Sequence, residues 1–268
     1  MVKDIFSKKI LKTFGAVALC ILKFVVLLFL SSMLFGSIAS MIGEVGYKLP
    51  PLLNQLISTD AMYIGVIILG YVYYSMNEEN MLVDCEIKKT TWSAVIKAFI
   101  LGFCMVAISS VLTSGLIYIF HLHSDTYNHV EQVYSLFDNS WLAISPIILA
   151  PILEEILCRG MLFHRLQKIV NFKIAIVIQA IFFAILHGNI IQFGYTFLMG
   201  IIAGYLVYYT KSLIPSIVFH FSNNLIGLMA VDMLSSNKII ENTYIILAPI
   251  VCLYLLWNIR KSSKLKIA

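Results

Sequence analysis

Long apolar runs separated by short polar stretches follow one another along the whole chain. A membrane-spanning helix needs about 20 mostly apolar residues, and about eight segments reach or approach that length. They are approximately 14–42, 60–76, 92–120, 141–166, 173–188, 192–209, 213–233 and 241–258. The pattern predicts an all-α, polytopic membrane bundle of about eight transmembrane helices. The fifth and sixth segments are short and are separated by a Gly188-Asn189 turn, which predicts a helical hairpin.

The composition supports a membrane protein. The chain is 60% hydrophobic and 12% charged, and its mean hydropathy is +0.91. Soluble domains carry about 25% charged residues. A soluble globule of this composition would have too little polar surface to cover its core. No repeat, low-complexity segment or linker divides the sequence, so residues 1–268 are predicted to form a single integral membrane domain.

Basic residues concentrate in alternate connections between the predicted spans. With the N-terminus inside, the outside loops hold only Lys48 and Lys238, and all other loop and terminal lysines and arginines fall inside. Such a bias is typical of cytoplasmic loops. It predicts a multi-pass protein of the cell membrane with an even number of spans and both termini in the cytoplasm. The placement suits a membrane surface, and no nucleic-acid partner is expected.

Two other groups of reactive side chains have simpler interpretations. The cysteines Cys20, Cys85, Cys104, Cys158 and Cys252 are scattered and contain no C-x-x-C pair, which indicates buried small side chains and no disulfide scaffold. The predicted outside loop 121–140 is rich in histidine and carboxylates, but its spacing matches no zinc pattern. We interpret it as a solvated connector.

Three charged residues interrupt the fourth apolar segment: Glu154, Glu155 and Arg159. Each charge near the centre of a bilayer costs roughly 2.5–3.5 kcal/mol on insertion scales, so it needs a structural or chemical reason. Glu155 and Arg159 are four residues apart and can pair on one helix face. Glu154 lies about 100° around the helix and has no such cation. An unpaired carboxylate suits general acid or base chemistry; the alternative is a purely structural polar cluster.

Later spans carry three more polar side chains. His187 ends the fifth segment, and His220 and Asn224 share one face of the seventh. Taken singly, they are typical of an interfacial histidine and of an interhelical hydrogen-bonded pair. Together with Glu154 they are the groups needed to activate a water molecule and to stabilise an oxyanion. Glu154, His187 and His220 could also hold a divalent metal such as zinc.

Three short motifs follow one another in these spans: Glu154-Glu155-x-x-x-Arg159-Gly160, Phe183-x-x-x-His187 and His220-x-x-x-Asn224. They resemble the motifs of the CPBP intramembrane proteases, also called the Abi or CAAX-protease family. That family includes the Rce1-type CAAX prenyl endopeptidases and bacterial bacteriocin-processing or immunity proteins. The resemblance covers about residues 140–230, the predicted catalytic core. Each motif alone is weak, but three in this order at this spacing are specific.

The resemblance implies an eight-helix protease that cuts a peptide bond within the bilayer toward the cytoplasmic side. Carried over by position, Glu154 and His187 would activate water, and His220 and Asn224 would form the oxyanion hole. Glu155 and Arg159 would support the glutamate-bearing helix. The resemblance leaves both a glutamate-type and a metallo-type mechanism open. Cys158 departs from the family, where many members carry an aromatic residue before the arginine, and this affects packing more than chemistry.

The expected function is an intramembrane endopeptidase acting on a membrane-associated peptide or protein. Abundant isoleucine, lysine and asparagine with few arginines are typical of Gram-positive bacteria of low GC content, which lack prenylated CAAX substrates. Pheromone or bacteriocin-type peptides, or a role in immunity or regulation, are then the expected context. The main alternative is a non-catalytic membrane scaffold or bacteriocin-immunity factor that binds a membrane partner. A small transporter using the polar cluster as a pathway is a further alternative.

Overall fold

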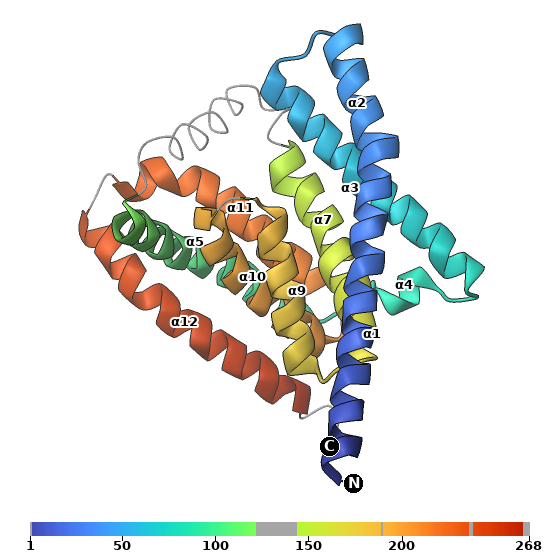
Figure 1. The fold of residues 1–268 in the computed structure, drawn as a ribbon. Helices are drawn as coiled ribbons and strands as arrows, with labels where there is room; N and C mark the ends of the chain where they lie inside the picture. The colour runs from blue at the N-terminus through green and yellow to red at the C-terminus, as the bar shows by residue number, and fades with distance from the viewer. Residues whose placement is uncertain (1, 122–143, 189, 236–237, 265–268) are drawn as a thin grey trace.

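The computed structural model describes residues 2–121, 144–188, 190–235 and 238–264, and over these ranges the chain contains helices and no strand (Figure 1). The predicted all-α class is confirmed. Elements labelled α are α-helices and those labelled η are π-helical. In order they are α1 (Val2–Ser31), η1 (Ser32–Gly36), α2 (Ser37–Met41), η2 (Ile42–Gly46), α3 (Pro51–Met76), α4 (Met81–Asp84), α5 (Trp92–Phe120), η4 (Ser145–Leu149), α7 (Ala150–Glu155), η5 (Ile156–Phe163), α8 (His164–Gln167), α9 (Phe172–Leu186), α10 (Ile190–Thr210), α11 (Ile214–Ser235) and α12 (Lys238–Lys264).

Several helices are long and apolar enough to cross a bilayer. Within the described ranges there are five, namely Ile10–Gly46, Leu53–Met76, Trp92–Phe120, Ile190–Thr210 and Lys238–Ser263, and α9 is a shorter apolar helix. The chain therefore has the features of a multi-pass membrane protein. The predicted segment 141–166 is also helical where it is described, and 213–233 is helical from Ile214. The count of eight spans and the cytoplasmic position of both termini stay predictions.

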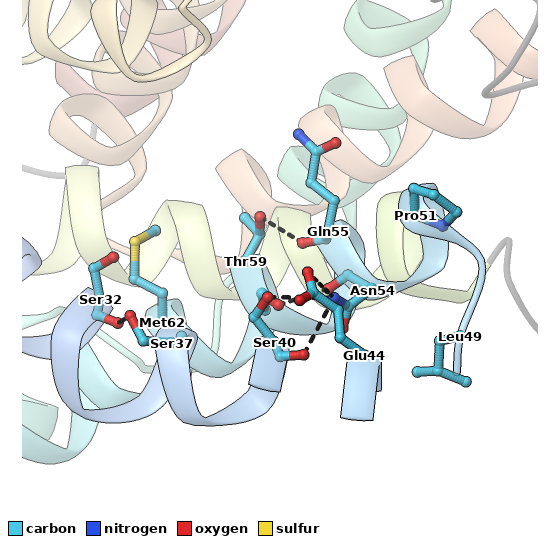
Figure 2. Close-up of a pocket in the computed structure, with 12 residues that line it drawn as sticks. Ser32, Ser37, Ser40, Glu44, Leu49, Pro51, Asn54, Gln55, Thr59 and Met62 are labelled. Atoms are coloured by element: carbon cyan, nitrogen blue, oxygen red, sulfur yellow. Dashed lines mark hydrogen bonds between the residues drawn. The ribbon is translucent and has the colours of Figure 1, made fainter. Parts of the chain in front are cut away.

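The second span begins earlier than the sequence pattern indicated. The apolar run was expected from residue 60, whereas α3 starts at Pro51. Its first turns carry Asn54, Gln55, Ser58 and Thr59, which lowered the apolar signal there. These side chains line a polar cavity of about 590 Å³ between α3 and the η1–η2 part of the first helix (Figure 2). The first turns of α3 are polar because they face the neighbouring helix across this cavity. The hydrophobic pattern of a single segment does not reveal such a pairing.

Asn54 connects the two helices across this cavity. Its amide donates to the Ser40 carbonyl at 3.2 Å and to the Glu44 carboxylate at 3.3 Å. Further along the same two helices, the Ser31 hydroxyl of α1 donates to the Met62 carbonyl of α3 at 2.5 Å. Hydrogen bonds between membrane helices are worth roughly 0.6–2 kcal/mol each. The first two spans therefore form a hydrogen-bonded pair.

Helix α5 supports α11, the helix that carries His220. The two pack along much of their length. The Ser222 hydroxyl donates to the Phe99 carbonyl at 2.7 Å. Gly102 allows the close approach, because a Cβ there would lie 2.6 Å from the Ser222 Cβ and 2.9 Å from the Asn223 nitrogen. Small residues permit such contacts between membrane helices.

The predicted helical hairpin is present as α9 and α10. Helix α9 ends before Gly188, which has φ +65°, a left-handed conformation that favours glycine. The Gln179 amide is buried and donates to the Gly200 carbonyl at 2.7 Å. A Cβ on Gly200 would lie 2.7 Å from the Ala180 Cα. Asn189, the second residue of the predicted turn, lies outside the described residues.

The outer surface of the bundle is apolar. Leu19 and Phe29 of α1 and Leu253 and Trp257 of α12 are all more than half exposed. An apolar surface of this extent requires a lipid environment or a partner. Helix α1 begins and α12 ends at the same end of the bundle (Figure 1).

We expect Gly102→Val to destabilise the protein, because the added side chain would press against the backbone of α11. Overpacking of this kind costs about 1–3 kcal/mol. Thermal unfolding of the detergent-solubilised protein would show a lower midpoint. Gly115→Val is the matched control in the same helix, since a Cβ at Gly115 meets nothing within 4 Å. Equal midpoints for the two variants would contradict the close packing of α5 on α11.

Candidate functional site

The polar centre is built on the helix that runs from Ser145 to Gln167. Its central α-helical turns, α7, lie between two π-helical stretches, η4 and η5. Pro146 and Pro151 each lack a backbone N–H, so the regular hydrogen-bond ladder cannot form at these positions. Single π-helical turns are frequent at functional sites. Glu154 and Glu155 are the last two residues of α7.

Glu155 and Arg159 form a buried ion pair. The Arg159 Nη1 lies 3.0 Å from the Glu155 Oε1, and the two side chains are 0% and 1% exposed. The guanidinium also packs on the Phe183 ring of α9, with 4.2 Å between Cζ and the ring centroid. An arginine stacked on an aromatic face gains further stabilisation when it is desolvated. The ion pair that the i, i+4 spacing predicted is therefore present.

His220 of α11 lies between the two glutamates. Its Nδ1 is 3.0 Å from the Glu155 Oε1, and its Nε2 is 3.9 Å from the Glu154 Oε2. An ionised carboxylate only accepts hydrogen bonds, so the Nδ1–H donates to Glu155. The ring is thereby oriented by the structural carboxylate and presents its other nitrogen toward Glu154.

Glu154 differs from its neighbour in exposure and in partners. Its side chain is 13% exposed, against 1% for Glu155. Tyr63 and Asp60 of α3 both lie close enough to interact electrostatically with it. The Ser145 hydroxyl donates to Asp60 at 2.6 Å and ties η4 to α3.

The sequence prediction missed Tyr63 and Asp60. They belong to the second span, outside the motifs, and their proximity to Glu154 is a long-range contact. The available signal was a carboxylate at the start of an apolar segment with a tyrosine three residues later on the same face.

His187 is held at the end of α9. Its Nδ1 lies 2.9 Å from the Phe183 carbonyl oxygen. A carbonyl can only accept, so Nδ1 carries a proton and, in the neutral ring, Nε2 keeps its lone pair. The Phe183 ring lies next to both histidines, with centroids 4.8 Å from His187 and 5.7 Å from His220. Phe183 therefore sets the spacing of the two imidazoles.

Asn224 lies one turn beyond His220 on α11. Its amide donates to the Pro146 carbonyl at 2.9 Å, and its Oδ1 accepts from the Asn223 amide at 3.1 Å. A carboxamide nitrogen carries two hydrogens, so one donor of Asn224 is left for another acceptor. These contacts connect the seventh predicted span to the start of the glutamate-bearing helix.

The described residues contain no group of three or more His, Cys, Asp or Glu side chains arranged to hold a metal ion. Glu154, His187 and His220 thus do not form a ready three-ligand set in this arrangement. The metal dependence of the protein stays a prediction. The histidine-rich loop after His121 lies outside the described residues.

In chemical terms, the site combines a partly exposed carboxylate, a histidine with an available nitrogen and two further side-chain donors. The Glu155–Arg159 pair and Phe183 fix their orientation. Such a set can deprotonate a water molecule and stabilise the negative charge that develops on a carbonyl oxygen. It carries no nucleophilic serine in a G-x-S-x-G context.

Residues 136–226 match the family model described as "Type II CAAX prenyl endopeptidase Rce1-like". The match covers all three motifs and confirms the resemblance over this part of the chain. It supports a protease, in general an intramembrane endopeptidase of the CAAX type. No curated protein and no solved structure matches the chain.

We expect Arg159→Ala to destabilise the protein by about 3–5 kcal/mol, since it leaves Glu155 buried without its cation. The measurement is the thermal midpoint in detergent. The double variant Glu155→Gln/Arg159→Met removes both charges and should recover much of the loss. A wild-type midpoint for Arg159→Ala would show that the pair does not support the helix.

Proposed function

We propose that the protein is an intramembrane endopeptidase in which Glu154 and His187 activate the water that hydrolyses a peptide bond. The family match over residues 136–226 supports protease activity. The observation that carries the assignment of roles is the contrast between the two glutamates. Glu155 is 1% exposed, forms an ion pair with Arg159 and accepts a hydrogen bond from His220, whereas Glu154 is partly exposed and lies 3.9 Å from His220.

Glu154 acts as the general base. It takes a proton from water, and the resulting hydroxide attacks the carbonyl carbon of the scissile peptide. When the carbon–nitrogen bond breaks, the same proton is delivered to the departing amine. His187 assists through its Nε2, which accepts a hydrogen bond from the water while its Nδ1 is held by the Phe183 carbonyl. A positioned base of this kind contributes about 10²–10⁴-fold to the rate.

His220 and Asn224 stabilise the oxyanion. Since Nδ1–H of His220 is bonded to Glu155, donation from Nε2 to the oxyanion uses the doubly protonated ring. Asn224 contributes its second amide hydrogen, because the first is bonded to Pro146. Donors that are already oriented cost little reorganisation when the charge develops.

The proposed substrate is a membrane-associated peptide or protein that reaches the site from the bilayer. Large apolar side chains cover the outside of the bundle, so the substrate has to be lipid-soluble along part of its length. Short hydrophobic peptides, such as pheromone or bacteriocin precursors of a bacterial host, meet this requirement. The cut would lie toward the predicted cytoplasmic side.

The central test is Glu154→Gln, which keeps the size of the side chain and removes its basicity. We expect cleavage to fall by at least about 10²-fold with the thermal midpoint unchanged. The assay compares peptides released from native membranes after incubation with wild-type or variant protein. Glu78→Gln is the matched control, because Glu78 is an exposed glutamate outside the site. Unchanged cleavage by Glu154→Gln would refute the assignment.

Two further measurements separate the alternatives. Metal content of the purified protein, with cleavage measured before and after chelation, distinguishes a glutamate-type from a metallo-type mechanism. A cellular phenotype that persists in Glu154→Gln would support a non-catalytic scaffold or immunity factor.

Asn224→Ala should lower kcat by about 10²–10³-fold and leave KM nearly unchanged, as expected for a donor that acts on the transition state. Steady-state kinetics on a peptide identified in the membrane assay would measure both constants. Asn77→Ala is the control, because Asn77 is an exposed asparagine outside the site, and it should retain most of kcat. A rise in KM alone would assign Asn224 to substrate binding instead.

A further inference from the structure

A second cavity lies at the end of the bundle where α12 ends, away from the glutamate site. It has a volume of about 1000 Å³ and is lined by residues of α5, α9, α10, α12 and the turns that precede α5 and follow α10. Four basic residues from different parts of the chain line it: Lys97, Lys173, Lys211 and Arg260. We call this cavity the basic groove.

The positive charge of the basic groove is largely uncompensated. Its lining contains no carboxylate. Among the described residues, no carboxylate forms an ion pair with Lys97, Lys173 or Arg260. Lys211 interacts at longer range with Glu86, but Glu86 has its own partner, Lys88, at 3.9 Å. Four cations around one cavity repel each other, so a bound anion would stabilise the arrangement.

Aromatic contacts hold the walls of the groove in place. The Phe172 and Tyr208 rings stack with centroids 3.9 Å apart and an interplanar angle of 7°. The Lys211 ammonium lies 4.4 Å from the Tyr208 ring centroid. Across the groove, the Tyr205 hydroxyl donates to the Leu256 carbonyl of α12 at 3.1 Å. The cavity is therefore formed before any ligand binds, which lowers the cost of binding.

The rest of the lining is apolar and continues onto the lipid-facing surface. Ile176, Val177 and Ile201 line the groove, and the neighbouring Ile174 and Ile181 of α9 are 46% and 40% exposed. A small hydrophilic anion would leave these side chains without a partner. The lining fits a ligand that carries a negative headgroup on an apolar tail.

We propose that the basic groove binds an anionic phospholipid from the leaflet at this end of the bundle. The phosphate lies among Lys173, Lys211 and Arg260, and an acyl chain packs on Val177 and Ile201. Basic pockets between membrane helices on the cytoplasmic side are suited to such headgroups. The positive-inside pattern predicts that this end is cytoplasmic.

The test is native mass spectrometry of the full-length protein with added phosphatidylglycerol or phosphatidylcholine. Wild-type protein should retain phosphatidylglycerol in preference to phosphatidylcholine. The triple variant Lys173→Gln/Lys211→Gln/Arg260→Gln should lose about fivefold in affinity per charge, or about 125-fold in total. The triple variant Lys12→Gln/Lys23→Gln/Lys48→Gln is the control, because it removes the same charge from exposed positions that do not line the groove.

Three outcomes would overturn the proposal. Equal retention of the two lipids by wild-type protein would exclude charge recognition, and that comparison needs no variant. Equal loss in both triple variants would indicate attraction by net charge alone. Thermal stabilisation by inorganic phosphate equal to that by phosphatidylglycerol, lost in the groove variant, would identify a soluble anion as the ligand.

Discussion

The buried guanidinium of Arg159 organises the polar centre of this protein. It lies between the Glu155 carboxylate and the Phe183 ring, and so contacts both its own helix and α9. Glu155 in turn orients His220 of α11. Because these groups are removed from water, each interaction is stronger than at a surface and each loss is more costly. The glutamate-bearing helix, α9 and α11 are thereby fixed around one charge.

This arrangement gives adjacent glutamates separate tasks. A helix turns by about 100° per residue, so neighbouring side chains point to different surroundings. Glu155 points to the arginine, and Glu154 points to the space bordered by His220 and α3. The chain can therefore place a fixed counter-ion and an available carboxylate within one turn. Glu155 keeps the His220 ring in its orientation, while Glu154 is available to act as a base.

The sequence predicted what depends on local spacing. The Glu155–Arg159 pair follows from an i, i+4 interval, and the α9–α10 hairpin follows from two short apolar runs around a glycine. It did not predict that His220 bonds most closely to Glu155, because that depends on how α11 is rotated against α7. It also missed Asp60, Tyr63 and the early start of α3. Those features arise from contacts between spans far apart in the chain, whose side chains carry no local periodic signal.

The π-helical turns of η4 and η5 have a consequence for how this region can change in evolution. A π-helical turn closes its backbone hydrogen bond between residues five apart, whereas an α-helical turn closes it between residues four apart, so the π-turn holds one more residue. Deleting a single residue could restore a regular α-helix, but everything beyond the deletion would rotate by about 100°. Between Ser145 and Phe163, the number of residues is therefore as much a part of the site as their identity. Substitutions can be absorbed one side chain at a time, whereas a change in length would separate Glu154 from its partners at once.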